Sequence, residues 1–146
     1  MAANTSPIYS KIGDIQWGAA DGNGGSAGAL KTANTAKDGT GTVLTVFTAD
    51  ATNGGRAERI RFRAAGTNVA TVARVFINNG STNGTAANNV LYDEITLPST
   101  TLSEVAALTN QELVLGIALP PGYKVNVTIG TTVSAGYFVS VIGGKY

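Results

Sequence analysis

The side chains that most often perform catalysis or bind metals are scarce in this sequence. It contains no histidine and no cysteine, which removes the usual acid–base group, the commonest zinc ligand and any disulfide. Asp93 and Glu94 are adjacent on a predicted strand. They therefore point to opposite faces and do not form a carboxylate pair. We expect no enzyme, with no catalytic residues, no metal site and no cofactor.

Two glycine-rich motifs resemble binding loops only in part. Residues 22–27 (GNGGSA) match the pattern G-x-G-x-x-A, but no predicted helix follows to hold a phosphate. Residues 21–25 (DGNGG) begin like a calcium loop, but the later oxygen ligands are missing. Neither motif predicts a site.

Five arginines make up half of the basic residues, and three of them share one strand face. In residues 56–66 (RAERIRFRAAG), alternation places Glu58, Ile60, Phe62 and Ala64 on one face and Arg59, Arg61 and Arg63 on the other. This stripe allows three interpretations: contact with nucleic acid, contact with an acidic protein surface, or a solvated face paired with carboxylates. The carboxylates that could pair with it from neighbouring strands are Asp93, Glu94 and Glu112.

Nucleic acid is the least favoured of these partners. The strand face that carries the arginines has no aromatic residues between them on which bases could stack. The net charge of the chain is only +1. An aromatic platform for sugars is another possibility, built from Tyr9, Trp17, Tyr92, Tyr123 and Tyr137. Such residues more often pack in a core or at its rim.

The composition favours a protein that lies against other proteins. Only 13% of the residues are charged, which is low for a soluble monomer, while the apolar fraction is an ordinary 43%. The N-terminal residues do not form a signal peptide, and no apolar run is long enough to span a membrane. We therefore expect synthesis in the cytosol and no membrane contact.

Short strands separated by polar turns fill almost the whole sequence. Alternating or β-branched runs predict strands at residues 14–18, 29–34, 42–50, 56–66, 68–78, 90–98, 112–120, 123–130 and 136–144. Residues 99–110 form either one helical turn with Leu102, Val105 and Leu108 facing inward or an extended crossover. The pattern predicts an all-β protein: an antiparallel β-sandwich of about eight strands, jelly-roll-like because its loops are long. We assign residues 1–28 to an irregular N-terminal arm with a Gly-rich loop, and residues 29–146 to the single sandwich domain.

Three predicted strands are apolar on both faces, whereas an antiparallel sandwich usually buries only one face of each sheet. These strands are residues 43–49, 69–77 and 137–142. Their second faces need a cover, either the N-terminal arm or a neighbouring subunit. The residues that we expect there are Val72, Phe76, Phe138 and Ile142.

Residues 34–142 resemble a family of small virion proteins of tailed bacteriophages. The words that carry the resemblance are RIRFRAAGTNVATVARVFINNG and LPPGYKVNVTIG, which consist of strands and turns. The family looks like head decoration, or capsid cement, proteins. The resemblance implies a viral β-domain that forms homo-oligomers and strengthens the joints between capsid subunits.

From the resemblance and the composition together, we expect a dimer or trimer that binds the major capsid protein on the exterior of the virion, after synthesis in the cytoplasm of the bacterial host. Arg59, Arg61 and Arg63 would contact acidic groups of the capsid, while Val72, Phe76, Phe138 and Ile142 would contact a sister subunit or the arm. The alternative functions are a tail or fibre component that binds a receptor or glycan, and a head–tail connector.

Overall fold

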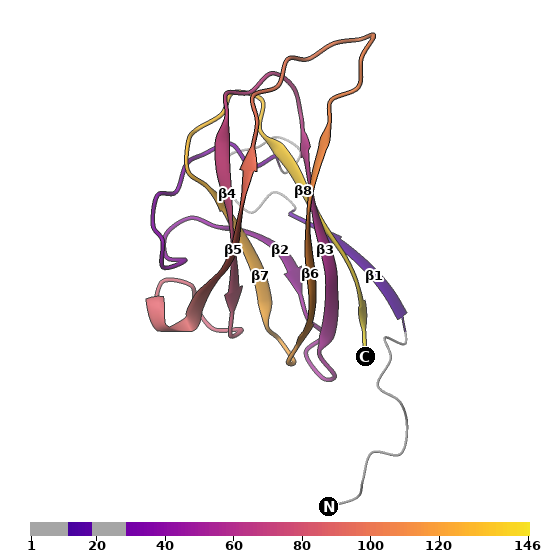
Figure 1. The fold of residues 1–146 in the computed structure, drawn as a ribbon. Helices are drawn as coiled ribbons and strands as arrows, with labels where there is room; N and C mark the ends of the chain where they lie inside the picture. The colour runs from indigo at the N-terminus through magenta and orange to yellow at the C-terminus, as the bar shows by residue number, and fades with distance from the viewer. Residues whose placement is uncertain (1–11, 19–28) are drawn as a thin grey trace, which may run out of the picture.

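The computed structural model describes residues 12–18 and 29–146, which form a sandwich of two four-stranded antiparallel sheets (Figure 1). In chain order the elements are β1 (Ile12–Trp17), β2 (Leu44–Thr48), β3 (Gly55–Ala64), β4 (Thr71–Asn78), the 3-10 helix η2 (Ala86–Asn88), β5 (Asn89–Leu97), β6 (Asn110–Leu119), β7 (Lys124–Ile129) and β8 (Tyr137–Lys145). One sheet has the order β1-β8-β3-β6 and the other β2-β7-β4-β5. The predicted all-β antiparallel sandwich is therefore confirmed.

The connections cross repeatedly between the two sheets. Each pair of consecutive described strands lies in different sheets, except β4 and β5, which pair directly with each other. This strand order is compatible with the predicted jelly roll.

The predicted strands match the observed ones closely, with two differences. Residues 29–34 form only isolated bridges, from Leu30 to Tyr137 and from Ala33 to Ile129. β1 lies within the stretch assigned to the N-terminal arm, yet it pairs with β8 along its whole length. Residues 12–17 therefore belong to the sandwich. Residues 1–11 and 19–28 of the arm, which include both glycine-rich motifs, lie outside the described part of the chain.

The connection from β5 to β6 is an extended crossover that projects beyond the sheets (Figure 1, orange). Its backbone contains no helical turn, and the side chain of Val105 is 97% exposed. Leu102 is also exposed, whereas Leu108 packs against the core. The helical-turn interpretation of residues 99–110 is therefore wrong and the crossover interpretation is right.

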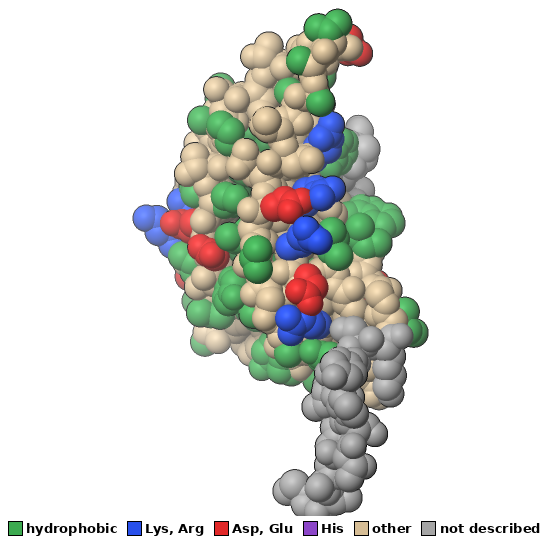
Figure 2. Space-filling view, turned by 45° about the vertical axis from the view of Figure 1, so that its right-hand side comes forward, with side chains coloured by type: hydrophobic (Ala, Val, Ile, Leu, Met, Phe, Trp, Pro, Cys, Tyr) green, Lys and Arg blue, Asp and Glu red, His purple; other side chains and the backbone are tan. Residues whose placement is uncertain are grey.

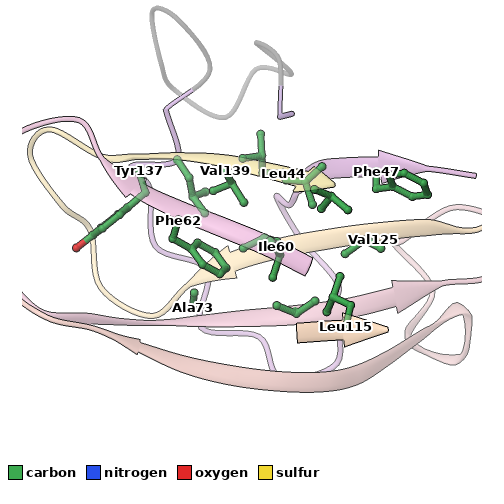
Figure 3. Close-up of a cluster of buried hydrophobic side chains, with 14 of the residues drawn as sticks. Leu44, Phe47, Ile60, Phe62, Ala73, Leu115, Val125, Tyr137 and Val139 are labelled. Atoms are coloured by element: carbon green, nitrogen blue, oxygen red, sulfur yellow. The ribbon is translucent and has the colours of Figure 1, made fainter. Parts of the chain in front are cut away.

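Apolar side chains from both sheets fill the space between them (Figure 3). Ile60 and Phe62 of β3 point toward Ala73 of β4 and Val125 of β7. Each of these four residues is completely buried. Burying one large apolar side chain contributes about 1.5–3 kcal/mol, so this layer is the main source of stability.

A β-bulge in β3 turns Glu58 to the opposite face from the one predicted. The pairing of β3 with β8 shifts between Ala57 and Arg59, which leaves Glu58 as an extra residue. The bulge moves the Glu58 side chain to the surface, although simple alternation placed it with Ile60 in the core. Beyond the bulge the prediction holds, because Ile60 and Phe62 are buried while Arg59 and Arg63 are exposed.

Candidate binding surface

The outer face of the β1-β8-β3-β6 sheet carries three rows of cross-strand neighbours. The first row is Ile15, Ile142, Arg59 and Val114; the second is Trp17, Ser140, Arg61 and Glu112; the third is Phe138, Arg63 and Asn110. We call these outward residues the arginine face. Figure 2 shows this side of the molecule, where basic and acidic side chains alternate beside hydrophobic ones.

Glu112 of β6 is the carboxylate partner of two of the three predicted arginines. Arg61 donates from Nε to Oε1 at 2.6 Å, and Arg59 Nη1 lies 3.6 Å from Oε2. The Arg61 hydrogen bond, aided by the charges of Arg61 and Arg59, holds the pKa of Glu112 below its usual value. The pairing predicted for a solvated face is therefore present for Glu112. Glu94 instead pairs with Arg74 in the other sheet.

Arg63 differs from its two neighbours because the oxygens it contacts are neutral. Its Nη1 donates to Asn110 Oδ1 at 2.8 Å and to the carbonyl of Leu108 at 3.5 Å. Among the described residues it forms no ion pair. Its positive charge is thus held in place by hydrogen bonds and is left without a local carboxylate.

Arg56 and Glu58 extend the charged part of the face at the β3 bulge, where they form an ion pair with each other. Glu58 also borders an open hollow in the surface. The hollow is lined by Glu58, Arg59, Glu112, Val114 and Ile142. With four arginines and two glutamates, this part of the surface carries two net positive charges.

Apolar side chains surround the arginines instead of lying in the core. Trp17 is 65% exposed, Val114 76% and Ile15 57%, and all three lie on the arginine face. Phe138 is 43% exposed and Ile142 is partly exposed, as predicted for the outward side of β8. Large apolar groups in such density on a solvent-facing sheet are typical of an interaction surface.

Val72 and Phe76 do not lie on this face. They belong to β4 in the other sheet, so the structure does not bring them together with Phe138 and Ile142. Phe76 is completely buried, so the prediction that it faces a sister subunit or the N-terminal arm is wrong.

The cover over Phe76 is a turn of the same chain. A Cβ added to Gly39 would lie 3.1 Å from Cδ1 of Phe76, which shows how closely the turn packs on the ring. The amide of Asn83 fixes this turn by donating to the carbonyl of Gly41 at 2.7 Å and to that of Gly39 at 3.3 Å. At Phe76, the second apolar face of β4 is therefore covered by the turn that contains Gly39.

The aromatic residues considered for sugar binding do not gather in one place. Tyr137 is buried in the core, and Tyr92 bonds through its hydroxyl to the carbonyl of Leu115 between the sheet edges. Only Trp17 is largely exposed on a sheet face, and Tyr9 lies outside the described residues.

Sequence reasoning missed Ile15, Trp17 and Val114 as members of the face. For Val114 the sequence held the information, since alternation in β6 makes Val114 point outward where its neighbours Leu113 and Leu115 point inward. For Ile15 and Trp17 the alternation in β1 was readable, but their stretch had been assigned to the arm.

Within residues 12–18 and 29–146, no group of three or more acidic side chains is placed to hold a metal ion. The same residues include no helix long and apolar enough to cross a membrane. No protein-family model, no curated protein and no solved structure matches this chain. The geometry of the arginine face is therefore the basis for a functional assignment.

Proposed function

We propose that this protein is a structural virion protein, without enzymatic activity, that decorates the outside of a phage capsid and stabilises it by bridging capsid subunits. Within this proposal the arginine face binds the major capsid protein. The observation that carries it is the combination of exposed apolar side chains with fixed, partly unneutralised arginines on one sheet face. The sequence resemblance to capsid decoration proteins supplies the kind of partner.

The apolar members of the face supply the driving force for adhesion. Trp17, Phe138 and Val114 would leave water when a partner covers them. Each square ångström of apolar surface buried contributes about 25 cal/mol. A modest contact repeated over many copies on one shell adds up to a large stabilisation of the joints between subunits.

The charged members select the partner. Arg63 contacts only neutral oxygens among the described residues, so its charge favours a carboxylate supplied by the other protein. Arg59 and Arg61 already share Glu112, and they add a weaker positive field. The proposed capsid surface is therefore acidic and partly apolar.

We extend the proposal to the finer features expected from the sequence: a jelly-roll topology, a homo-oligomer and a location on the exterior of the virion. The alternation of consecutive strands between the two sheets supports the jelly roll.

The test is cosedimentation of the purified protein with capsids of the encoding phage that were assembled without it. Replacing Arg59, Arg61 and Arg63 with glutamate should weaken binding at least about thirtyfold, since losing buried charge pairs costs about 2–5 kcal/mol. The matched control is Lys37→Glu, which makes the same kind of charge change in the turn over the opposite sheet. Unchanged binding by the triple variant, with its fold intact by circular dichroism, would refute the proposal.

One observation favours the alternative of a tail or fibre component that binds a glycan. The Trp17 ring is exposed on an outer sheet face, as aromatic rings are in many sugar-binding sites. Binding to host cells that is lost in Trp17→Ala, without binding to capsids, would establish this alternative. A copy number of about a dozen per virion would indicate a connector instead.

A further inference from the structure

The four edge strands of the sandwich differ in their regularity. β-Bulges interrupt the pairing of β2, β5 and β6, at Val46, Tyr92 and Gly116. Bulges at sheet edges discourage pairing with other chains. β1, in contrast, pairs with β8 without any register shift from Ile12 to Trp17. It is the one regular edge among the described strands.

The free side of β1 presents a defined set of backbone groups. Gly18 donates its amide to the carbonyl of Val139, which continues the β1–β8 ladder. Because inward and outward hydrogen bonds alternate along an antiparallel strand, the amides and carbonyls of Gly13, Ile15 and Trp17 point to the free edge. Within the described residues no other strand pairs with this edge.

The side chains of β1 do not protect this edge. The strand contains no lysine and no proline, which commonly guard exposed edges. Its single charge belongs to Asp14, which accepts a hydrogen bond from Gln16 at 2.6 Å and lies 4.0 Å from Lys145 Nζ. The outward side chains Ile15 and Trp17 are apolar and exposed.

We propose that β1 pairs antiparallel with β1 of a second copy of this chain, about a twofold axis that passes through Ile15. This register sets Ile15 opposite Ile15 of the second copy and Asp14 opposite Gln16. It also lays Trp17 over Gly13, where an aromatic ring covers a residue with no side chain. All the free backbone groups of Gly13, Ile15 and Trp17 then find partners.

The neighbouring twofold registers are poorer. Moving the axis to Asp14 sets two carboxylates directly opposite each other, which is destabilising. Moving it to Gln16 leaves only residues 15–17 of each strand paired. The sequence of β1 is thus self-complementary in one register, and this argues for a second copy over a foreign strand.

Such a dimer would join two β1-β8-β3-β6 sheets into one continuous sheet. The arginine faces of both copies would lie on the same side and form one larger surface. The inference deepens the homo-oligomer that the proposed function includes and does not depend on capsid binding, because it concerns the purified protein alone.

The first experiment is the molar mass in solution by light scattering over a range of concentrations. We expect twice the monomer mass of 14.8 kDa. Ile15→Lys and Ile15→Glu should each be monomeric, because each places like charges opposite each other. An equimolar mixture of the two should recover the dimer. Val114→Lys, on the opposite edge strand of the same sheet, is the matched control and should stay dimeric.

A second measurement tests the register. The chain has no cysteine, so a single Ile15→Cys variant can report on the proposed axis. Opposite residues in a hydrogen-bonded antiparallel pair have Cα atoms about 5.5 Å apart, within the range of a disulfide. Mild oxidation should crosslink Ile15→Cys and not Asp14→Cys.

Three results would overturn the proposal. They are a monomer at every concentration, an oligomer that persists in both charged Ile15 variants, and crosslinking through residue 14 in place of residue 15. None of them bears on capsid binding, which is measured separately with the arginine variants.

Discussion

Arg63 of β3 and Phe138 of β8 are direct cross-strand neighbours on the outer face of the sandwich. The guanidinium is held by Asn110 at 2.8 Å, and the ring beside it is 43% exposed. Arginine and aromatic residues contribute much of the binding energy of many protein interfaces and tend to cluster there. This pair is therefore the point on the arginine face where we expect a partner to be held most tightly.

The first prediction contrasts Phe138 with Tyr137, its neighbour in the chain. Tyr137 is 2% exposed and donates its hydroxyl to the carbonyl of Pro98, so Tyr137→Ala should lower the free energy of unfolding by about 3–5 kcal/mol. Phe138→Ala should lower it by about 1 kcal/mol or less, since its ring is half in solvent. Urea unfolding measures both values. Of the two variants, only Phe138→Ala should lose capsid binding while it remains folded. Equal losses of stability would contradict the assigned faces.

The second prediction concerns Glu112 and pH. Because Arg61 lowers the pKa of Glu112 in the folded protein, the ionised carboxylate stabilises the fold at pH values above its unfolded pKa of about 4.3. This contribution is lost as the pH falls through the lowered folded pKa. Glu112→Gln should therefore be less stable than the wild type at pH 7, and the difference should shrink below about pH 4. Urea unfolding over a pH series checks this, and a constant difference from pH 7 to pH 2 would contradict it.

The third prediction tests the cover over Phe76. Gly39 has φ +77°, and an added Cβ would lie 2.7 Å from Cβ of Asn89. Gly39→Ala should therefore destabilise the protein by more than about 1 kcal/mol and expose Phe76. Gly84→Ala is the matched control, because Gly84 does not have a positive φ and its added Cβ would meet only Thr82 Oγ1, at 3.4 Å. Similar midpoints of thermal unfolding for the two variants would show that the turn does not hold the ring.

The fourth prediction concerns the hydrogen bond that links the open edges of the two sheets. Tyr92 of β5 donates its hydroxyl to the carbonyl of Leu115 in β6 at 3.0 Å. Tyr92→Phe should lower the free energy of unfolding by about 1 kcal/mol and leave the core unchanged. Tyr123→Phe serves as the control, since no hydrogen bond of the Tyr123 hydroxyl is found within the described residues. Chemical denaturation of the two variants distinguishes them, and equal stabilities would contradict the role of Tyr92.

Local sequence patterns predicted most of the strands because alternation is a short-range signal. Ile60 and Phe62 point inward and Arg63 points outward, as their alternation predicts. Glu58 points to the other face than predicted. A bulge depends on the pairing strand, so the alternation of β3 alone does not reveal it.

The candidate surface was predicted less well than the fold. Phe138 and Ile142 were correctly predicted to lie on the outward side of their strand, and the three arginines on the outward side of theirs. That these residues share one sheet face was not predicted. Phe76 was not placed correctly, because its cover comes from a turn some forty residues earlier in the chain, and no local pattern reports such a contact. The pairing of β1 with β8 is also long-range, and for this reason Ile15 and Trp17 were assigned to the arm.

The position of β8 has a consequence for the order of events during synthesis. Among the described strands, β8 pairs with β1 and β3 and lies between them, yet it is the last of the three to leave the ribosome. Until it emerges, β1 has no partner in its sheet and β3 pairs only with β6. Until β8 emerges, the nascent chain therefore keeps two strand edges unpaired, and these edges can pair with other chains during that interval.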